Sequence, residues 1–338
     1  MNMSNNVGIN GFGRIGRQIL RIISEDRLDI NVKAINGRSE TETYYHLLKY
    51  DSAYGKLNAE INFDKNNLYI NDRKIRCYRE NDPSLIPWEE NDISLVVEST
   101  GKFIEKNQAN KHLGRSVKKV LLTAPGKDDD ITIVMGVNEE KYDPKIHNII
   151  SNSSCTTNCL APIIKILEEN YVIEKGFMTT IHSYTNDQNI LDKSHKDFRR
   201  ARAAATSIIP TTTGAAKSIG KIIKSVNGKL DGMAFRVPTP SCSVIDLNVI
   251  LKKPTDVNNI NELFIEYSKN QMRGILDVSD EELVSIDFLK NPHSSIIDLK
   301  STLNVGENMF KIVSWYDNEW GYSARTIDIA KIILTSIT

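Results

Sequence analysis

A glycine turn near the amino terminus is the feature that most narrows the possible folds. Val7 and Ile9 begin a short apolar strand that runs directly into Gly11-Phe12-Gly13-Arg14-Ile15-Gly16, and isoleucines then recur with helical spacing. A second apolar strand follows at residues 30–35. Strand, turn, helix and strand make a βαβ unit, whose crossover places both strands parallel in one sheet. The first part of the chain is therefore predicted to be an α/β domain.

The same turn fits a phosphate-binding function. Gly11 permits the tight turn, Gly13 lets the backbone approach a pyrophosphate, and Gly16 lets the helix pack on the sheet. The amino terminus of the helix offers free N–H groups to phosphate. A purely structural turn can have the same letters, but the position at the first βα turn of an alternating region favours a dinucleotide site.

The end of the second strand bears on which dinucleotide binds. NAD sites usually have an acidic residue about 20 positions after the last glycine. Here Asn36-Gly37-Arg38-Ser39 contains no carboxylate, so a 2′-phosphate would not be repelled, and Arg38 with Ser39 could bind one. This favours NADP or the use of both cofactors. The alternative is that Gly37 only makes a turn and Arg38 points into water.

The pattern changes after residue 151. A helical stretch has Leu160, Ile163, Ile164 and Leu167 on one side, and longer alternating strands are expected at 176–182, 230–237, 244–251 and 310–316. Alternation over 244–251 predicts a half-exposed antiparallel strand packed on helices. The second part is therefore expected to be α+β. Shorter strands are expected at 93–97, 120–122, 131–135 and 149–150, a hairpin at 68–76, and helices at 258–267 and 325–337.

Composition excludes several classes of protein. The 338 residues contain 43 Lys+Arg and 43 Asp+Glu, a balance that argues against binding to nucleic acid or to anionic membranes. No apolar run approaches the ~20 residues that span a bilayer. The first residues, 1–6, are polar and do not resemble a secretory signal, so we expect a cytoplasmic protein. Four irregularly spaced cysteines predict neither a disulfide framework nor a zinc site.

One cysteine has the position of a nucleophile. Cys155, within Ser151–Cys159, follows an apolar strand and opens a helix, whose positive end should lower the thiol pKa. Pro162 could kink or restart that helix. The other cysteines, Cys77, Cys159 and Cys242, are expected to be small buried hydrophobic residues.

A cysteine nucleophile needs a base or a cation beside it. His182 ends a strand and precedes the polar run 183–188, which makes it the favoured histidine. Solvated side chains are expected for His46, His112, His147, His195 and His293. Arg200, Arg236 and the Thr213-Gly214 helix start are candidate anion contacts, whereas Arg199 and Arg202 better fit a solvated or subunit-contact face.

These features, taken together and in order along the whole chain, closely resemble phosphorylating glyceraldehyde-3-phosphate dehydrogenases. The blocks concerned are residues 7–17, 50–52, 98–101, 153–162, 199–202, 213–217, 236–240 and 315–319. The Ser-Cys-Thr-Thr-Asn-Cys block is the most specific of them.

The resemblance implies roles for individual residues. Cys155 looks like the nucleophile that forms a thiohemiacetal and then a thioester, with His182 as its base. Thr185, Arg200 and Arg236 resemble residues that bind the substrate C3 phosphate, and Ser154, Thr156, Thr213 and Gly214 resemble those that hold the attacking phosphate. The cofactor contacts implied in the same way are Asn10, Gly11, Phe12, Gly13, Arg14, Ile15, Gly37, Arg38, Ser99, Thr100, Thr123, Ser194, Asn318 and Tyr322.

The family's organisation is expected here too. It comprises a Rossmann-type parallel-sheet domain, residues 1–154 and 320–338, and a catalytic domain, residues 155–319, with a mainly antiparallel sheet and flanking helices. The implied ligands are a sugar phosphate, inorganic phosphate and NAD or NADP, with no metal, and the implied assembly is a homotetramer.

Two departures from the NAD-specific members bear on the cofactor. Gly37 stands where those members have Asp, and Asp192-Lys193-Ser194-His195 replaces their Asp-Leu-Pro-His. Members that use NADP tend to have Ser at the position of Ser194. Two alternatives remain open: an erythrose-4-phosphate dehydrogenase, which would not require phosphate, and a non-catalytic binding protein.

Overall fold

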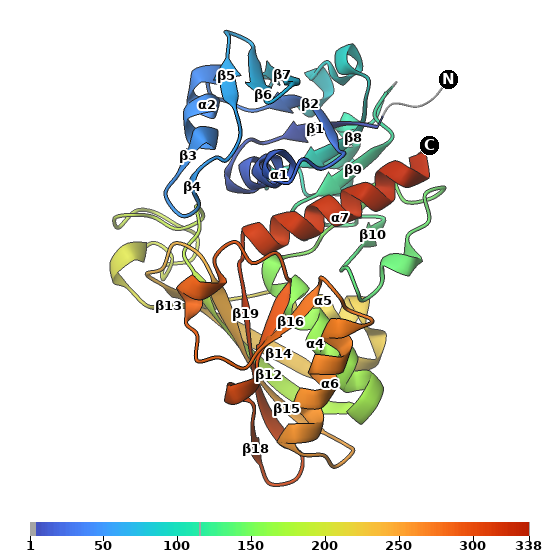
Figure 1. Ribbon diagram of the computed structural model, residues 1–338, viewed down its shortest axis with the longest axis vertical. Helices are drawn as coiled ribbons and strands as arrows, with labels where there is room; N and C mark the ends of the chain where they lie inside the picture. The colour runs from blue at the N-terminus through green and yellow to red at the C-terminus, as the bar shows by residue number, and fades with distance from the viewer. Residues whose placement is uncertain (1–4, 115, 338) are drawn as a thin grey trace. The chain divides into compact units, whose positions relative to one another are not determined.

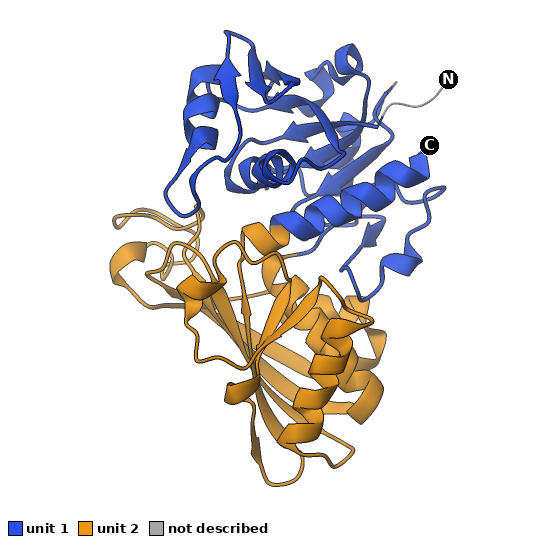
Figure 2. Ribbon diagram, viewed as in Figure 1, with its two compact units in different colours: residues 1–153, 323–338 blue, residues 154–322 orange. Residues whose placement is uncertain are grey.

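The computed structural model describes residues 5–114 and 116–337. The chain forms two compact units, Met1–Ser153 with Ser323–Thr338 and Ser154–Tyr322, shown in blue and orange in Figure 2. Most of the polar start considered above, residues 1–4, lies outside the described part. Among the described residues, no helix is long and apolar enough to cross a membrane.

The first unit is built on a nine-stranded sheet in the order β10-β11-β9-β8-β1-β2-β7-β6-β5 (Figure 1). From β10 to β7 neighbouring strands run parallel, as the βαβ pattern predicts, and β5, β6 and β7 pair antiparallel. The strands are β1 (Asn6–Asn10), β2 (Asn31–Asn36), β5 (Ile61–Phe63), β6 (Asn67–Ile70), β7 (Arg73–Tyr78), β8 (Ile93–Glu98), β9 (Lys119–Leu122), β10 (Ile131–Thr132) and β11 (Ile149–Ser151). The predicted hairpin is confirmed, whereas the strand expected at 131–135 ends at Thr132.

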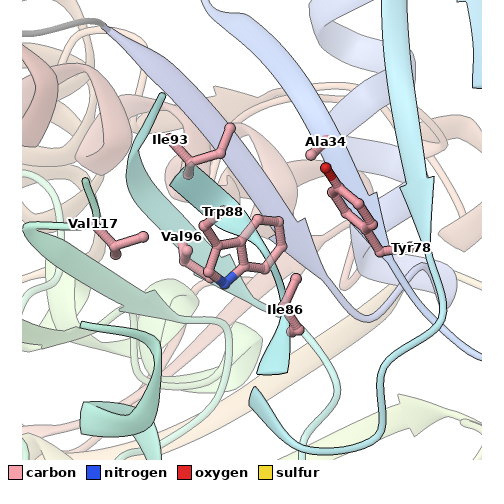
Figure 3. Packing of buried hydrophobic residues seen from close by; sticks show 7 residues of the cluster. All are labelled: Ala34, Tyr78, Ile86, Trp88, Ile93, Val96 and Val117. Carbon is pink, nitrogen blue, oxygen red and sulfur yellow. The ribbon is translucent and has the colours of Figure 1, made fainter. Parts of the chain in front are cut away.

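Helices and short turns cover this sheet. The helices are α1 (Arg14–Glu25), α2 (Thr41–Lys49), α3 (Lys106–Ala109) and most of α7 (Trp320–Ile337). The 3-10 turns are η1 (Pro83–Leu85), η2 (Trp88–Asn91), η3 (Asn110–His112) and η4 (Glu139–Lys141). A separate two-stranded sheet pairs β3 (Tyr50–Asp51) with β4 (Gly55–Lys56). Trp88 fills a pocket of apolar side chains around β8, with Ile93, Val96 and Val117 among its neighbours (Figure 3).

One sequence prediction in this unit is wrong. His112 was expected to be solvated, but its side chain is completely buried beside Trp88 and Glu98. The two residues before it, Asn110 and Lys111, are polar, and its burial comes from β8 and η2, which lie elsewhere in the chain.

The second unit contains an eight-stranded mixed sheet in the order β13-β14-β12-β15-β19-β17-β16, with β18 paired to β19. Pairing is antiparallel except for β12 with β14 and β16 with β17. The strands are β12 (Ile173–Ser183), β13 (Ile209–Thr212), β14 (Leu230–Val237), β15 (Ser243–Leu251), β16 (Leu276–Ser279), β17 (Ser295–Asp298), β18 (Leu303–Val305) and β19 (Met309–Tyr316). Strand β15 alternates between buried and half-buried residues, which confirms the expected half-exposed strand.

Helices α4 (Cys155–Tyr171), α5 (Ala215–Ile222) and α6 (Val257–Lys269) pack on this sheet (Figure 1), and the remaining turns are η5 (Ala204–Thr206), η6 (Lys224–Val226), η7 (Ser285–Phe288) and η8 (Leu299–Ser301). Helix α4 runs through Pro162 without a break, so the restart considered from the sequence does not occur. The helix packs against β12, β15, β17 and β19, and this packing keeps it continuous despite the missing N–H of the proline.

The glycines of the first turn differ in what surrounds them, which gives a matched pair of variants. A Cβ at Gly16 would lie 2.3 Å from the carbonyl oxygen of Gly11, whereas a Cβ at Gly13 meets nothing within 4 Å. We expect Gly16→Ala to lower the free energy of unfolding by about 1–3 kcal/mol through overpacking. Gly13→Ala should leave it nearly unchanged. Urea denaturation of both variants tests this, and equal losses would contradict it.

Candidate active site

Cys155 is the first residue of helix α4. The helix is capped by Ser154, whose Oγ accepts a hydrogen bond from the backbone N–H of Thr157 at 3.1 Å. An extended Ser154 followed at once by helical backbone directs the orphan N–H groups of the first turn around the cysteine. Cys155 is half-buried, whereas Cys77, Cys159 and Cys242 are buried, as predicted.

Sheet pairing brings a histidine and an arginine to this thiol. His182 and Arg236 are directly opposite each other in the parallel pair β12 and β14. Nε2 of His182 lies 3.4 Å from Sγ of Cys155. On the other side of the ring, Nη1 of Arg236 lies 2.7 Å from Nδ1 and donates to the carbonyl oxygen of Ser183 at 2.9 Å. Cys155, His182 and Arg236 therefore form one connected group.

The electrostatics of the group favour a neutral imidazole. Burial lowers the pKa of His182 to about 3, and the positive charges of Arg236 and Arg200 act in the same direction. The tautomer depends on which partner Nδ1 uses. With its hydrogen on Nδ1, the ring donates to the carbonyl of Ser183, 2.6 Å away, and Nε2 can accept the thiol proton. With Nδ1 accepting from Arg236, Nε2 donates to sulfur instead.

The thiol pKa corrects an expectation from the sequence. A helix amino terminus predicts a lowered pKa, but burial raises the pKa of Cys155 above its ordinary value. The charge of Arg236 and hydrogen bonds with Thr156 act against this effect without overcoming it. Thiol and imidazole are therefore both neutral at rest, and the nucleophile has to be generated by proton transfer to His182.

Tyr316 completes the wall behind the group and was not found from the sequence. Its hydroxyl lies 3.0 Å from Oγ1 of Thr156 and 2.9 Å from Oγ1 of Thr180, and its ring meets that of His182 edge to face. Burial raises the pKa of Tyr316 well above its ordinary value, so the phenol stays protonated. Its fixed hydroxyl orients Thr156, which was predicted to bind the attacking phosphate.

Arg200 has carboxylate partners of its own. It forms ion pairs with Asp187 and Asp197, and its Nε donates to Oγ1 of Thr211 at 3.0 Å. Its charge still acts on both His182 and Arg236, which shows that it lies in the same electrostatic environment. Arg199 is exposed, as the sequence suggested, and Arg202 pairs with Asp192.

The other predicted anion contacts lie around two short segments. Gly214 precedes helix α5, and Oγ1 of Thr213 accepts from the backbone N–H of Ala215 at 3.3 Å. The N–H of Thr185 donates to Gln188.

Three predicted cofactor contacts lie in this second part of the sequence. Ser194 is exposed. Asn318 is buried and accepts a hydrogen bond from Ser243 at 2.9 Å, and Tyr322 is also buried.

A separate cavity in the first unit fits the dinucleotide. It has a volume of about 620 Å³ and opens at the glycine turn and the carboxyl ends of β1, β2 and β8. Gly11 has a φ of +94° and no room for a side chain, while Gly13 faces open space. The predicted contacts that line the cavity are Asn10, Gly11, Phe12, Gly13, Gly37, Arg38, Ser39, Ser99 and Thr100. A backbone cradle of this kind is what a pyrophosphate needs.

Some predicted contacts are outside the cavity wall, and others were missed. Arg14 pairs with Asp51 at 2.5 Å, Thr123 bonds to the backbone of Glu98, and neither these two nor Ile15 line the cavity. The missed lining residues are Asn36, Tyr44, Glu80, Asn81, Lys102 and Phe103. Four of these, Asn36, Glu80, Asn81 and Lys102, lie at or shortly after the ends of parallel strands, where ligands of open α/β sheets bind, and that rule could have found them.

Comparison with known proteins decides the family. Residues 154–318 match the model described as "Glyceraldehyde 3-phosphate dehydrogenase, C-terminal domain", and residues 5–106 match "Glyceraldehyde 3-phosphate dehydrogenase, NAD binding domain". The chain belongs to the glyceraldehyde-3-phosphate dehydrogenase family. The predicted family, its two-part fold and an NAD-binding first domain are thereby confirmed.

Individual members of the glyceraldehyde-3-phosphate dehydrogenase family are similar over nearly the whole chain. The glyceraldehyde-3-phosphate dehydrogenase of Geobacillus stearothermophilus is 52% identical over 331 residues, 98% of each chain. Glyceraldehyde-3-phosphate dehydrogenase 2 of Bacillus subtilis (strain 168) is 50% identical, covering 96% of this chain and 95% of its own. Glyceraldehyde-3-phosphate dehydrogenase 2 of Nostoc sp. (strain PCC 7120) is 49% identical, and the similarity covers 97% of this chain and 98% of its own.

The charge of Arg236 gives a pH prediction. Because the guanidinium lowers the pKa of Cys155, its removal in Arg236→Leu should shift the midpoint of the pH profile for alkylation upward. Iodoacetamide labelling of Cys155, followed by peptide mass spectrometry from pH 6 to 11, measures that midpoint. Arg199→Leu, at an exposed arginine, is the control and should not move it. An unchanged or lowered midpoint in Arg236→Leu would contradict the assigned coupling.

Proposed function

We propose that this chain is a phosphorylating glyceraldehyde-3-phosphate dehydrogenase, which oxidises D-glyceraldehyde 3-phosphate with inorganic phosphate to 1,3-bisphosphoglycerate, reversibly. The observation that supports it most is the 3.4 Å contact between the Cys155 thiol and a neutral His182 backed by Arg236. Family membership and about 50% identity to named members support the same reaction.

The chemistry follows from these groups. The thiol of Cys155 gives its proton to Nε2 of His182 as sulfur attacks the aldehyde carbon, forming a thiohemiacetal. The backbone N–H of Cys155 and the imidazolium stabilise the oxygen as it gains charge, and the imidazolium then returns its proton to that oxygen, which completes the thiohemiacetal hydroxyl. NAD, when bound, supplies the acceptor for the hydride of that carbon. His182 takes up the hydroxyl proton, which leaves a thioester on Cys155. An oxygen of inorganic phosphate then attacks the thioester carbon, and the sulfur leaves with the proton held by His182, which restores the thiol and the neutral imidazole.

Phosphate binding is assigned to the cationic side of the site. Arg236 and Arg200, with Thr185, would hold the C3 phosphate, because two guanidinium groups act on the same imidazole. Ser154, Thr156, Thr213 and Gly214 would hold the attacking phosphate. Arg200 would have to exchange part of its pairing with Asp187 for the ligand.

The cofactor assignment extends to NADP. NAD binding follows from the family, and we propose that NADP is also accepted because Gly37 provides no carboxylate to repel a 2′-phosphate. Arg38 and Lys102 line the cavity, and Glu80 is the one carboxylate among the described lining residues. We also assign Ser194 to the discrimination between NAD and NADP, acting on the cofactor bound to a neighbouring subunit. Asn318 and Tyr322 are assigned to the nicotinamide end.

A cytoplasmic homotetramer is part of the proposal. Strands of the second sheet present three large apolar side chains to solvent: Phe177, 70% exposed, Met233, 37% exposed, and Met309, 40% exposed. Large apolar side chains grouped on an open sheet face are typical of subunit interfaces.

Replacing the nucleophile tests the function. Cys155→Ala should lower kcat/KM by more than ~10³-fold, because the covalent route is lost. Cys159→Ser is the matched control: that thiol is buried between Ser295 and Ser314, and the variant should stay close to wild type. Turnover is followed by the absorbance of reduced cofactor, with and without phosphate. Near-normal rates in Cys155→Ala would overturn the mechanism, and phosphate-independent rates would favour an erythrose-4-phosphate dehydrogenase.

Arg38 tests the cofactor proposal. Arg38→Ala removes a charge-assisted bond to the 2′-phosphate, so kcat/KM for NADP should fall by on the order of tenfold or more. The value for NAD should change by less than about twofold, since NAD has no such group. Steady-state kinetics with both cofactors give the ratio. A wild-type preference for NAD of two orders of magnitude or more would refute NADP use.

A further inference from the structure

A buried polar network stands behind the dinucleotide cavity, and its central residues have no role in the proposed mechanism. Its centre is Glu98, at the carboxyl end of β8, and His112, in η3, whose side chains are 1% and 0% exposed. Trp88, in η2, and Asn10, at the carboxyl end of β1, complete it. Asn10 and Glu98 are partners in the register of β1 and β8, so the network sits at the sheet edge that lines the cavity.

The direction of each hydrogen bond in the network follows from Trp88. Nε1 of Trp88 can only donate, and it lies 3.2 Å from Nδ1 of His112, so Nδ1 is the bare nitrogen. Nε2 then has the hydrogen and donates to Oε2 of Glu98 at 3.0 Å. The same oxygen accepts from Nδ2 of Asn10 at 2.5 Å. Trp88 is itself held by apolar packing, which makes it a fixed support for the imidazole (Figure 3).

The second oxygen of Glu98 holds the cavity wall. Oε1 accepts from the backbone N–H of Thr100 at 2.8 Å and also from the Thr100 hydroxyl. A Cβ on Gly11 would lie only 2.6 Å from that backbone nitrogen, so the turn 98–101 is held tightly against the glycine turn. Gly11, Ser99 and Thr100 all line the cavity. Glu98 therefore sets the spacing between two of its walls.

The network reaches a third wall through an asparagine. Asn36, at the end of β2, donates from Nδ2 to Oδ1 of Asn10 at 2.8 Å. Its Oδ1 accepts from the backbone N–H of Glu80 at 2.8 Å, and Glu80 also lines the cavity. One chain of hydrogen bonds thus connects the ends of β1, β2, β7 and β8.

We propose that Glu98, His112 and Trp88 are positioning residues for the dinucleotide, which hold the turn 98–101 and the glycine turn at the spacing that binding requires. The proposal rests on the assignment of this cavity to NAD. Burying a carboxylate and an imidazole stabilises a fold less than apolar packing of the same volume would. Instead, the hydrogen bonds of the buried pair fix the positions of the strand ends that line the dinucleotide cavity.

Two substitutions at one position separate bonding from packing. His112→Phe fills a similar volume and removes both hydrogen bonds, whereas His112→Gln retains one donor and one acceptor. We expect His112→Phe to weaken NAD binding by on the order of tenfold or more, as for the loss of buried hydrogen bonds. His112→Gln should recover most of the affinity. The turnover number at saturating NAD should change by less than about twofold in both, because neither variant touches Cys155 or His182.

A readout without cofactor makes the test specific. Amide hydrogen exchange of the peptide that contains Thr100 should be faster in ligand-free His112→Phe, because the bond from Thr100 to Glu98 is loosened. Glu98→Gln should show the same, since one amide oxygen cannot accept on both sides. Dissociation constants for NAD come from calorimetry, independently of turnover.

The control removes a buried polar anchor elsewhere in the same unit. Nζ of Lys119 donates to the backbone carbonyl oxygen of His147 at 2.8 Å and to Oδ1 of Asn148 at 2.9 Å, away from the cavity lining. Lys119→Met should lower the melting temperature without changing NAD affinity or exchange at Thr100. The proposal is overturned if His112→Phe binds NAD like wild type, or if His112→Gln is as weak as His112→Phe. Absence of NAD binding by the wild-type protein would instead refute the cofactor assignment.

Discussion

The reactive group depends on the parallel pairing of β12 with β14 inside a mainly antiparallel sheet. This register places Arg236 beside His182, and the start of α4 places Cys155 on the other side of the ring. A buried cation next to the imidazole disfavours the imidazolium, so His182 stays neutral and can accept a proton. The same cation favours the thiolate of Cys155. One guanidinium therefore lowers the pKa of both partners of the proton transfer: it favours the thiolate of Cys155 and disfavours the imidazolium of His182.

Burial gives this pair its resting state. Because burial raises the pKa of Cys155 and lowers that of His182, the neutral thiol and neutral imidazole are favoured over the ion pair. Charge then appears when sulfur bonds to carbon, in surroundings where helix N–H groups and Arg236 can stabilise it.

Features with local signatures could be predicted from the sequence. The glycine turn predicted the βαβ unit, alternation predicted β15, and the block around Cys155 predicted the family. Features that arise from distant segments could not. His112 has polar neighbours in sequence but is buried by β8 and η2, and Tyr316 reaches the site from β19. The direction of the Cys155 pKa was missed for the same reason, because burial is a property of the folded unit and not of a helix start.

The central claim is that substrate is held covalently on Cys155, and trapping the thioester tests it most directly. The protein is mixed with glyceraldehyde 3-phosphate and NAD without inorganic phosphate, quenched in acid and digested for mass spectrometry. The account predicts one added 3-phosphoglyceroyl group on the peptide of Cys155, released when phosphate is supplied before the quench. An unmodified Cys155 peptide, or the same group on a different residue, would contradict it.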